Sequence, residues 1–286
     1  MSADIRLAVA TNAETLARIR EPLADRGITA DHVAVSERTL PLDGSLGAFD
    51  VGFVFPSRLM EGGVADAMLD VPWVNSREDI LRSRNKAGVL ARLSATDVST
   101  PQSVLVSNPV SDTDLEAVWE RFDPPVVVKP NSTTRGTGIA KVSDFDSLLG
   151  VTDYLDLVHD YRATGDRSYL IQEYLPDARD YRVMTIDGEY VGAVERRLPD
   201  AALAEGRWKH NVHRGAEATG VDLDAELQQV AERAARTLDI DWLGVDILVT
   251  DEGAVVNETN ARPTVDTAMK YESDFYDRLA ELIRSR

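Results

Sequence analysis

The segment from residue 242 to residue 261, WLGVDILVTDEGAVVNETNA, constrains the chain most, because it reads as two apolar strands joined by a tight turn. The TDEG run at 250–253 suits a hairpin connection, so the two strands are expected to pair antiparallel. Side chains alternate between the two faces of a strand, which puts Asp246 on the face opposite Val245. Glu258 and Asn260 share a face of the second strand. The hairpin therefore predicts that three oxygen ligands converge.

Two carboxylates and an amide oxygen suit a hard octahedral cation such as Mg2+ or Mn2+, whose remaining ligands are water and the phosphates of a nucleotide. A polar hairpin edge is the alternative, because Asp and Asn are ordinary turn residues. Glu258 and Asn260 interrupt an otherwise apolar strand, which favours the metal site.

A second segment, PPVVVKPNSTTRGTGIAKV at 124–142, predicts a hairpin that covers phosphates. Lys129 ends a run of valines, and the loop at 131–138 consists of small residues, hydroxyls and two glycines. Backbone N–H groups of such a loop can approach phosphate oxygens, and Lys129 adds a point charge. The segment is not a Walker loop, since no GK[ST] occurs in the chain, and there is no GxGxxG. A purely structural turn is the alternative.

These motifs, taken in order, resemble those of the ATP-grasp ligases, and within them the RimK-like glutamate ligases, with glutathione synthetase as a more distant relative. The resemblance runs from about residue 83 to about residue 265. Besides the two segments above, three others carry it: SRNKAGVLARLSATDVSTPQSVLV at 83–106, YLIQEYLPDARDYRVMTIDGEYVGAVERR at 169–197, and WKHNVHRGA at 208–216.

The fold class expected is α/β and α+β. Alternating strands and a helix before residue 56 predict a small open α/β lobe, with strands in IRLAVAT, HVAV and VGFVF. The resemblance implies the ATP-grasp fold, in which two α+β subdomains clasp ATP. The expected ranges are an N-terminal pre-ATP-grasp domain at 1–94, a small subdomain at 95–176 and a large subdomain at 177–286.

The resemblance also implies a role for each matching residue. ATP would be held by residues of four segments, namely Lys86, Lys129, Ser132, Thr133, Gly136, Gly138, Gln172, Glu173, Tyr174, Leu175 and Asp180. Of these, the two lysines would contact phosphates, 172–175 would line the adenine, and Asp180 would hold the ribose. The reacting carboxylate and the transferred phosphoryl group would be faced by Arg182, Arg196, Asn211 and Arg214. Two Mg2+ ions would be bound by Asp246, Glu258 and Asn260.

The activity implied is that of an ADP-forming carboxylate–amine ligase working through an acylphosphate, with glutamate as the amino acid added to a small-molecule, peptide or protein acceptor. Three alternatives stay open: ligation of another amino acid or a glutathione-like peptide, a nucleotide-binding regulatory module, and a kinase-like enzyme. The chain departs from the family pattern at Asn85, where Asp is common, and in ARPTVD at 261–266. Arg262 could therefore mark a different or more acidic substrate.

The acidic balance of the chain limits its partners. Asp and Glu number 49 against 31 Lys and Arg, a formal net charge of -18, which argues against a nucleic-acid partner because phosphates would be repelled. No apolar run reaches the length of a membrane span, and the N-terminus lacks the pattern of a signal peptide, so a cytoplasmic protein is expected. Without cysteine, disulfides and thiol catalysis are excluded. A homo-oligomer is a family expectation only.

The same charge balance predicts a salt-adapted protein, because concentrated salt screens the repulsion among carboxylates. We expect thermal stability and activity to rise as KCl is increased from 0.1 M to molar concentration. Full stability and activity at low ionic strength, with no gain in molar salt, would instead indicate an ordinary acidic enzyme.

Overall fold

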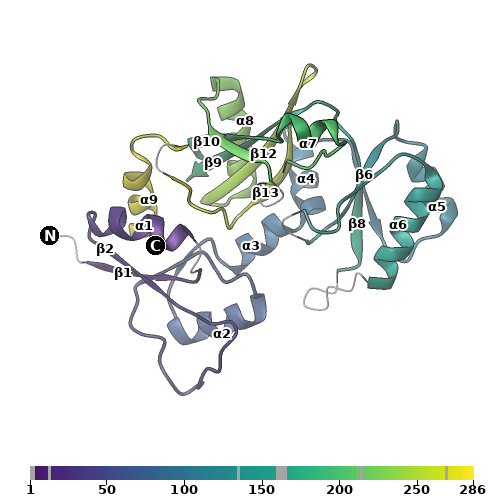
Figure 1. The fold of residues 1–286 in the computed structure, drawn as a ribbon. Coiled ribbons are helices and arrows are strands. Elements are labelled where there is room, and N and C mark those ends of the chain that lie inside the picture. The colour runs from purple at the N-terminus through teal and green to yellow at the C-terminus, as the bar shows by residue number, and fades with distance from the viewer. Residues whose placement is uncertain are drawn as a thin grey trace.

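The computed structural model describes residues 4–11, 14–133, 136–158, 166–210, 212, 215–267 and 270–286. In this part of the chain the strands form three separate sheets, each covered by helices (Figure 1). One four-stranded sheet lies in the N-terminal lobe, a second four-stranded sheet in the middle of the chain, and a five-stranded sheet in the C-terminal part.

The N-terminal sheet is parallel, in the order β2-β1-β3-β4. Its strands are β1 (Ile5–Val9), β2 (Ile28–His32), β3 (Val51–Phe53) and β4 (Trp73–Val74), and its helices are α1 (Glu14–Ala24) and α2 (Leu59–Leu69). The strand predicted over HVAV is wrong beyond His32. Ile28 and Ala30 are the buried residues of β2 that pair with β1, and one residue past the strand the Val33 N–H group donates to Val9 O.

Two consecutive helices, α3 (Arg77–Arg84) and α4 (Lys86–Ser94), lead from this lobe to the middle of the chain. A capping box of Ser76 and Asp79 starts α3, and the Asn85 side chain caps α4 by accepting from the Gly88 N–H group. Lys86 is therefore the first residue of a well-defined helix, which fixes the direction of its side chain.

The middle sheet is antiparallel, in the order β5-β8-β6-β7. It contains β5 (Ser103–Ser107), β8 (Ser168–Glu173), β6 (Val126–Pro130) and β7 (Ala140–Val142). Helices α5 (Asp112–Trp119) and α6 (Phe145–Val158) cover it and enclose a core of their own. The β-branched run of β6 is fully buried, which places Lys129 at the inner end of a central strand.

The C-terminal sheet is also antiparallel, in the order β11-β10-β9-β12-β13. It contains β9 (Arg179–Ile186), β10 (Glu189–Arg197), β11 (Glu217–Gly220), β12 (Trp242–Thr250) and β13 (Gly253–Asn260). The helices of this part are α7 (Asp200–Ala204), α8 (Ala225–Leu238) and α9 (Phe275–Arg284). The predicted hairpin is present, with its turn at residues 251 and 252.

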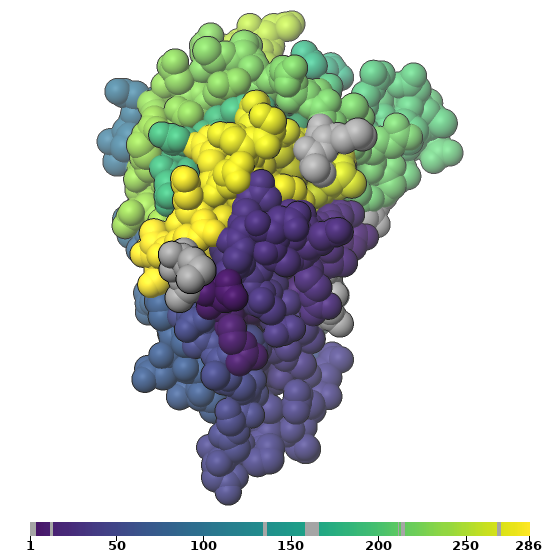
Figure 2. All heavy atoms as spheres, turned by 90° about the vertical axis from the view of Figure 1, so that its left-hand side faces the viewer, coloured from purple at the N-terminus to yellow at the C-terminus, as the bar shows by residue number. Residues whose placement is uncertain are grey.

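The N-terminal lobe and the C-terminal sheet share one continuous hydrophobic core, although they lie at opposite ends of the sequence. Helix α9 packs on α1, and Figure 2 shows the last segment of the chain lying directly on the first. Each of the three predicted domain ranges contains one complete sheet, while the boundaries themselves stay a prediction. None of the described helices is both long and apolar enough to cross a membrane.

Asn75 joins these two parts of the core. Its side chain is fully buried, donates to Trp242 O and to Ala261 O at 2.6 Å, and accepts from the Trp242 N–H group at 3.1 Å. Its backbone is left-handed, with φ of 57°. Replacing the amide leaves buried backbone groups without partners, so we expect Asn75→Ala to lower the free energy of unfolding by about 3 kcal/mol.

The matched variant Asn75→Gly loses the same amide but tolerates the left-handed backbone. It is therefore expected to be about 1 kcal/mol more stable than the alanine variant in denaturant titrations. Equal stability of the two variants would show that the backbone conformation at this position costs nothing.

Candidate active site

A cavity of about 950 Å³ lies between the middle sheet and the C-terminal sheet, and residues from both sheets, from α3 and from α4 line it. Eleven of the described lining residues are Lys or Arg and six are Asp or Glu. The cavity is therefore basic on a chain whose net charge is -18, which favours an anionic ligand.

The β12–β13 hairpin brings Asp246 and Glu258 side by side through a bulge. From the turn, the register pairs Thr250 with Gly253 and continues regularly to Ile247 and Val256. The next regular pair would join Asp246 to Asn257 and turn Glu258 toward the core. A register shift after Ile247 instead pairs Asp246 with Glu258. Both carboxylates and Asn260 thus line the cavity, as the sequence predicts, but an irregularity is needed to place them there.

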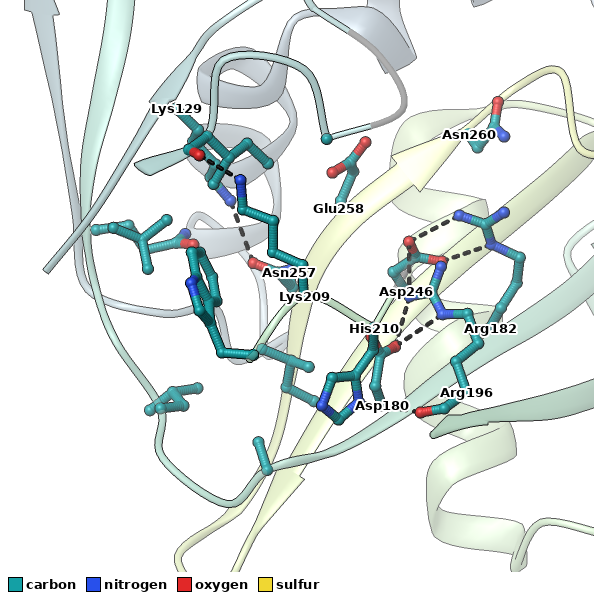
Figure 3. Close-up of a pocket in the computed structure, with 18 of the residues that line it drawn as sticks. Lys129, Asp180, Arg182, Arg196, Lys209, His210, Asp246, Asn257, Glu258 and Asn260 are labelled. Carbon is teal, nitrogen blue, oxygen red and sulfur yellow. Dashed lines mark hydrogen bonds and ion pairs between the residues drawn. The ribbon is translucent and has the colours of Figure 1, made fainter. Parts of the chain in front are cut away.

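Charged side chains of alternating sign cross the cavity floor on neighbouring strands (Figure 3). Arg182 of β9 forms two hydrogen bonds of 2.8 Å to the two carboxylate oxygens of Asp246 on β12. Arg196 of β10 pairs with Asp246 at 3.0 Å and with Asp180 at 2.5 Å. The two predicted substrate-facing arginines are therefore both engaged with Asp246 in this structure.

Burial and ion pairing set the pKa values of this group. Burial opposes the charge of Asp246, but the two guanidinium groups outweigh it and lower the pKa of Asp246 to about 2. For Asp180 burial prevails and raises the pKa, although Arg196 opposes the shift. Asp246 is therefore a firmly ionised anchor for two arginines.

Two buried lysines occupy the opposite wall. Lys129 and Lys86 are 2% and 5% exposed, and burial lowers the pKa of Lys129 to about 8, with Glu258 opposing this shift. Lys86 donates to Thr133 O and lies 3.6 Å from Glu258. A buried ammonium group attracts an anion more strongly than one in water, because the effective dielectric constant around it is lower. Both lysines therefore suit phosphate oxygens.

The first N–H groups of α4 already have partners, so phosphate binding there depends on side chains. Asn131 O accepts from Lys86 N–H at 3.3 Å, and Asn131 Oδ1 accepts from Ala87 N–H at 2.8 Å. Asn85 caps Gly88, and its Oδ1 also accepts from Asn131 Nδ2. Asn85, which departs from the family pattern, thus supports the helix that presents Lys86.

Residues 172–175 line the cavity, as do the apolar residues Val127, Ile139 and Leu248. The Gln172 and Glu173 side chains turn to Ser103 Oγ and to Gln102 N–H, respectively. The rings of Trp208 and Tyr174 are perpendicular, with 5.8 Å between their centroids, and Lys141 Nζ lies 4.5 Å from the centroid of the Tyr174 ring. Apolar and aromatic side chains of this kind suit a flat aromatic ring system.

Most of the predicted site residues meet in this cavity. Its lining includes Lys86, Lys129, Gly136, Gln172, Glu173, Tyr174, Leu175, Asp180, Arg182, Arg196, Asp246, Glu258 and Asn260. Ser132, Thr133 and Gly138 are not among the lining residues, although they belong to the loop next to Lys129. Asn211 and Arg214 lie outside the described residues.

Sequence reasoning missed several lining residues. Lys141, Trp208 and Lys209 lie within the motif segments at 124–142 and 208–216, but no role was predicted for them. Lys209 donates to Ile139 O, the backbone group just before β7. Arg262 donates to Phe55 O and thereby ties the segment after β13 to the N-terminal lobe. Only the departure of Arg262 from the family pattern signalled it in advance.

The three candidate metal ligands provide only oxygen atoms, which suits Mg2+ or Mn2+. Among the described residues no group of three or more His, Asp or Glu side chains could hold a metal. Asp246 is bonded to two arginines, Asn260 Oδ1 accepts from Arg262 N–H at 2.9 Å, and the Glu258 side chain is 25% exposed toward the cavity. The oxygen donors are of the kind that a hard cation takes, but Asp246 and Asn260 are engaged with arginines in this structure, and Glu258 is the most open of the three side chains toward the cavity.

The RimK-like ATP-grasp domain family matches residues 83–283. A probable alpha-L-glutamate ligase of Stenotrophomonas maltophilia is 29% identical over 191 residues, which are 66% of this chain and 61% of the relative. The ribosomal protein bS6–L-glutamate ligase of Escherichia coli O139:H28 is 30% identical over 192 residues, 66% of this chain and 59% of the relative. The chain thus matches about three fifths of the length of these curated relatives.

The solved structure of a RimK domain ATP-grasp protein from Sphaerobacter thermophilus superimposes with a TM-score of 0.69 and 20% identity, covering 98% of this chain and 99% of that one. The ATP-grasp fold predicted from the motifs is therefore confirmed, and the family match extends past residue 265 into α9. The chain belongs to the RimK-like ATP-grasp family.

Proposed function

We propose that this chain is an ATP-dependent carboxylate–amine ligase that forms an amide bond, with L-glutamate as the amino acid added. The observation that carries the proposal is the cavity between two sheets. It is lined by two buried lysines, Lys86 and Lys129, and by the carboxylates and arginines of the C-terminal sheet. The glutamate ligases to which the chain is similar support glutamate as the amino acid.

The proposed roles follow from the chemistry of each wall. Lys86 and Lys129 hold phosphate oxygens, and the apolar residues that line the cavity together with 172–175 contact the adenine. Asp180 remains the proposed ribose contact, although its carboxylate already accepts from Arg196. Asn211 and Arg214, which lie in the WKHNVHRGA segment, are proposed to contact the transferred group.

The proposed reaction has two steps. A substrate carboxylate oxygen bonds to the γ-phosphorus of ATP and ADP leaves, which gives an acylphosphate. The amine nitrogen then attacks the acyl carbon, loses a proton, and inorganic phosphate departs. Arg182 and Arg196, which pair with Asp246 on the cavity floor, are proposed to balance the negative charge of the transferred phosphoryl group. Divalent cations, two in the proposal, would neutralise phosphate charge beside Glu258, Asp246 and Asn260.

The decisive experiment measures ADP release with Mg-ATP in molar KCl, with single amino acids and with or without a small-molecule cell extract, followed by mass analysis. Glutamate-dependent turnover and a new glutamyl amide would establish the ligase and identify the acceptor. Phosphorylated product without amide would indicate the kinase-like alternative, and ATP binding without amino-acid-dependent ADP a regulatory module.

A further inference from the structure

The bulge of β13 leaves Asn257, which a regular hairpin would have paired with Asp246, without a partner residue on β12. Asn257 is the extra residue between the Ile247–Val256 pair and the Asp246–Glu258 pair. Because a bulge puts two successive residues opposite one, both Asn257 and Glu258 can turn to the same side. Both line the cavity, whereas Val256 is fully buried in the core.

Asn257 contacts the more deeply buried of the two lysines. Lys129 Nζ donates to Asn257 Oδ1 at 3.2 Å, across the space between the middle sheet and the C-terminal sheet (Figure 3). An ammonium group has three donors, so a contact with one neutral acceptor fixes its direction and leaves two donors for another ligand. The acceptor carries no charge and therefore does not neutralise Lys129.

We propose that Asn257 is a positioning residue for Lys129, which holds the ammonium group toward the phosphates of a bound nucleotide. The inference rests on the proposed function in that the ligand is taken to be ATP. Glu258 could not replace Asn257 in this role without pairing with the ammonium group and competing with the phosphates. Two consecutive residues of β13 thus have different proposed roles: Asn257 contacts the lysine, and Glu258 binds the cation.

The test is a double-mutant cycle on nucleotide binding, measured by calorimetry with Mg2+ and the non-hydrolysable analogue AMP-PNP, without amino acid or acceptor. Asn257→Leu removes the acceptor oxygen and is expected to weaken AMP-PNP binding about tenfold, the effect of one hydrogen bond to a charged group. In a Lys129→Met background the same substitution is expected to change the affinity less than twofold, because the group through which it acts is gone.

Val255→Leu is the matched control, since it introduces leucine two residues earlier in the same strand at a position outside the cavity lining. Its affinity for AMP-PNP is expected to equal that of the unmodified chain, and thermal melts establish that each variant is folded. An equal loss in both backgrounds, or no loss in the Asn257→Leu variant, would overturn the positioning role. Failure of the unmodified chain to bind AMP-PNP would overturn the proposed function instead.

Discussion

Replacing Glu258 by Gln is expected to reduce ADP formation by on the order of 10³-fold, to background, while the fold remains intact. The substitution preserves the shape of the side chain and removes its charge. Glu258 is paired with Asp246 across the hairpin, faces the cavity, and lies 3.6 Å from Lys86. As the most open carboxylate among the candidate metal ligands, it is the group whose charge a divalent cation would require most.

The effect is measured as glutamate-dependent ADP release at saturating Mg-ATP, together with a thermal melt. Glu252→Gln makes the same chemical change in the exposed turn of the same hairpin and should leave turnover unchanged. Near-normal turnover in the Glu258 variant would refute the assignment of this carboxylate to the metal.

Replacing Asp246 by Asn is expected to lower the free energy of unfolding by about 3–5 kcal/mol at pH 7 in metal-free buffer. The carboxylate is buried and bonded to both Arg182 and Arg196, so its neutralisation leaves two guanidinium groups without their shared counter-ion. Denaturant titration measures the loss. Asp241→Asn, which breaks the more exposed pair with Arg286, is expected to cost less than about 1 kcal/mol.

The pH dependence of this difference has a definite sign. The arginines lower the pKa of Asp246 from 3.8 to about 2 against the effect of burial. A carboxylate with a lowered pKa stabilises the folded state above its ordinary pKa, and this contribution is lost as the pH falls toward the folded value. The stability gap between the unmodified chain and Asp246→Asn should therefore narrow between about pH 4 and about pH 2, and a gap constant over this range would contradict the ion-pair account.

Much of the site could be predicted because its residues belong to local patterns. The β-branched run before Lys129 and the apolar strands around Asp246 can be recognised from residue composition and alternation. The order of the motifs along the chain indicated the ATP-grasp family. The alternation of apolar and polar side chains along a strand depends only on residues that are neighbours in the sequence, so it can be recognised before the tertiary structure is known.

The remaining features required the tertiary structure. Counting from the predicted turn pairs Asp246 with Asn257, and only the bulge brings Glu258 beside Asp246. The contact of Asn257 with Lys129 depends on how the middle sheet packs against the C-terminal sheet. Likewise, nothing near Asn75 in sequence shows that its amide bonds to Trp242 and Ala261.

The sequence by itself determined most of the strands and helices, the family, and most of the residues that line the cavity, because these depend on periodicity and residue type. The tertiary structure alone decided the register at the bulge, the pairing of Arg182 and Arg196 with Asp246, and the contact of Lys129 with Asn257. The physical reason is that the arginine and lysine contacts join strands far apart in the chain, and that the register of the hairpin is set by the packing of whole sheets.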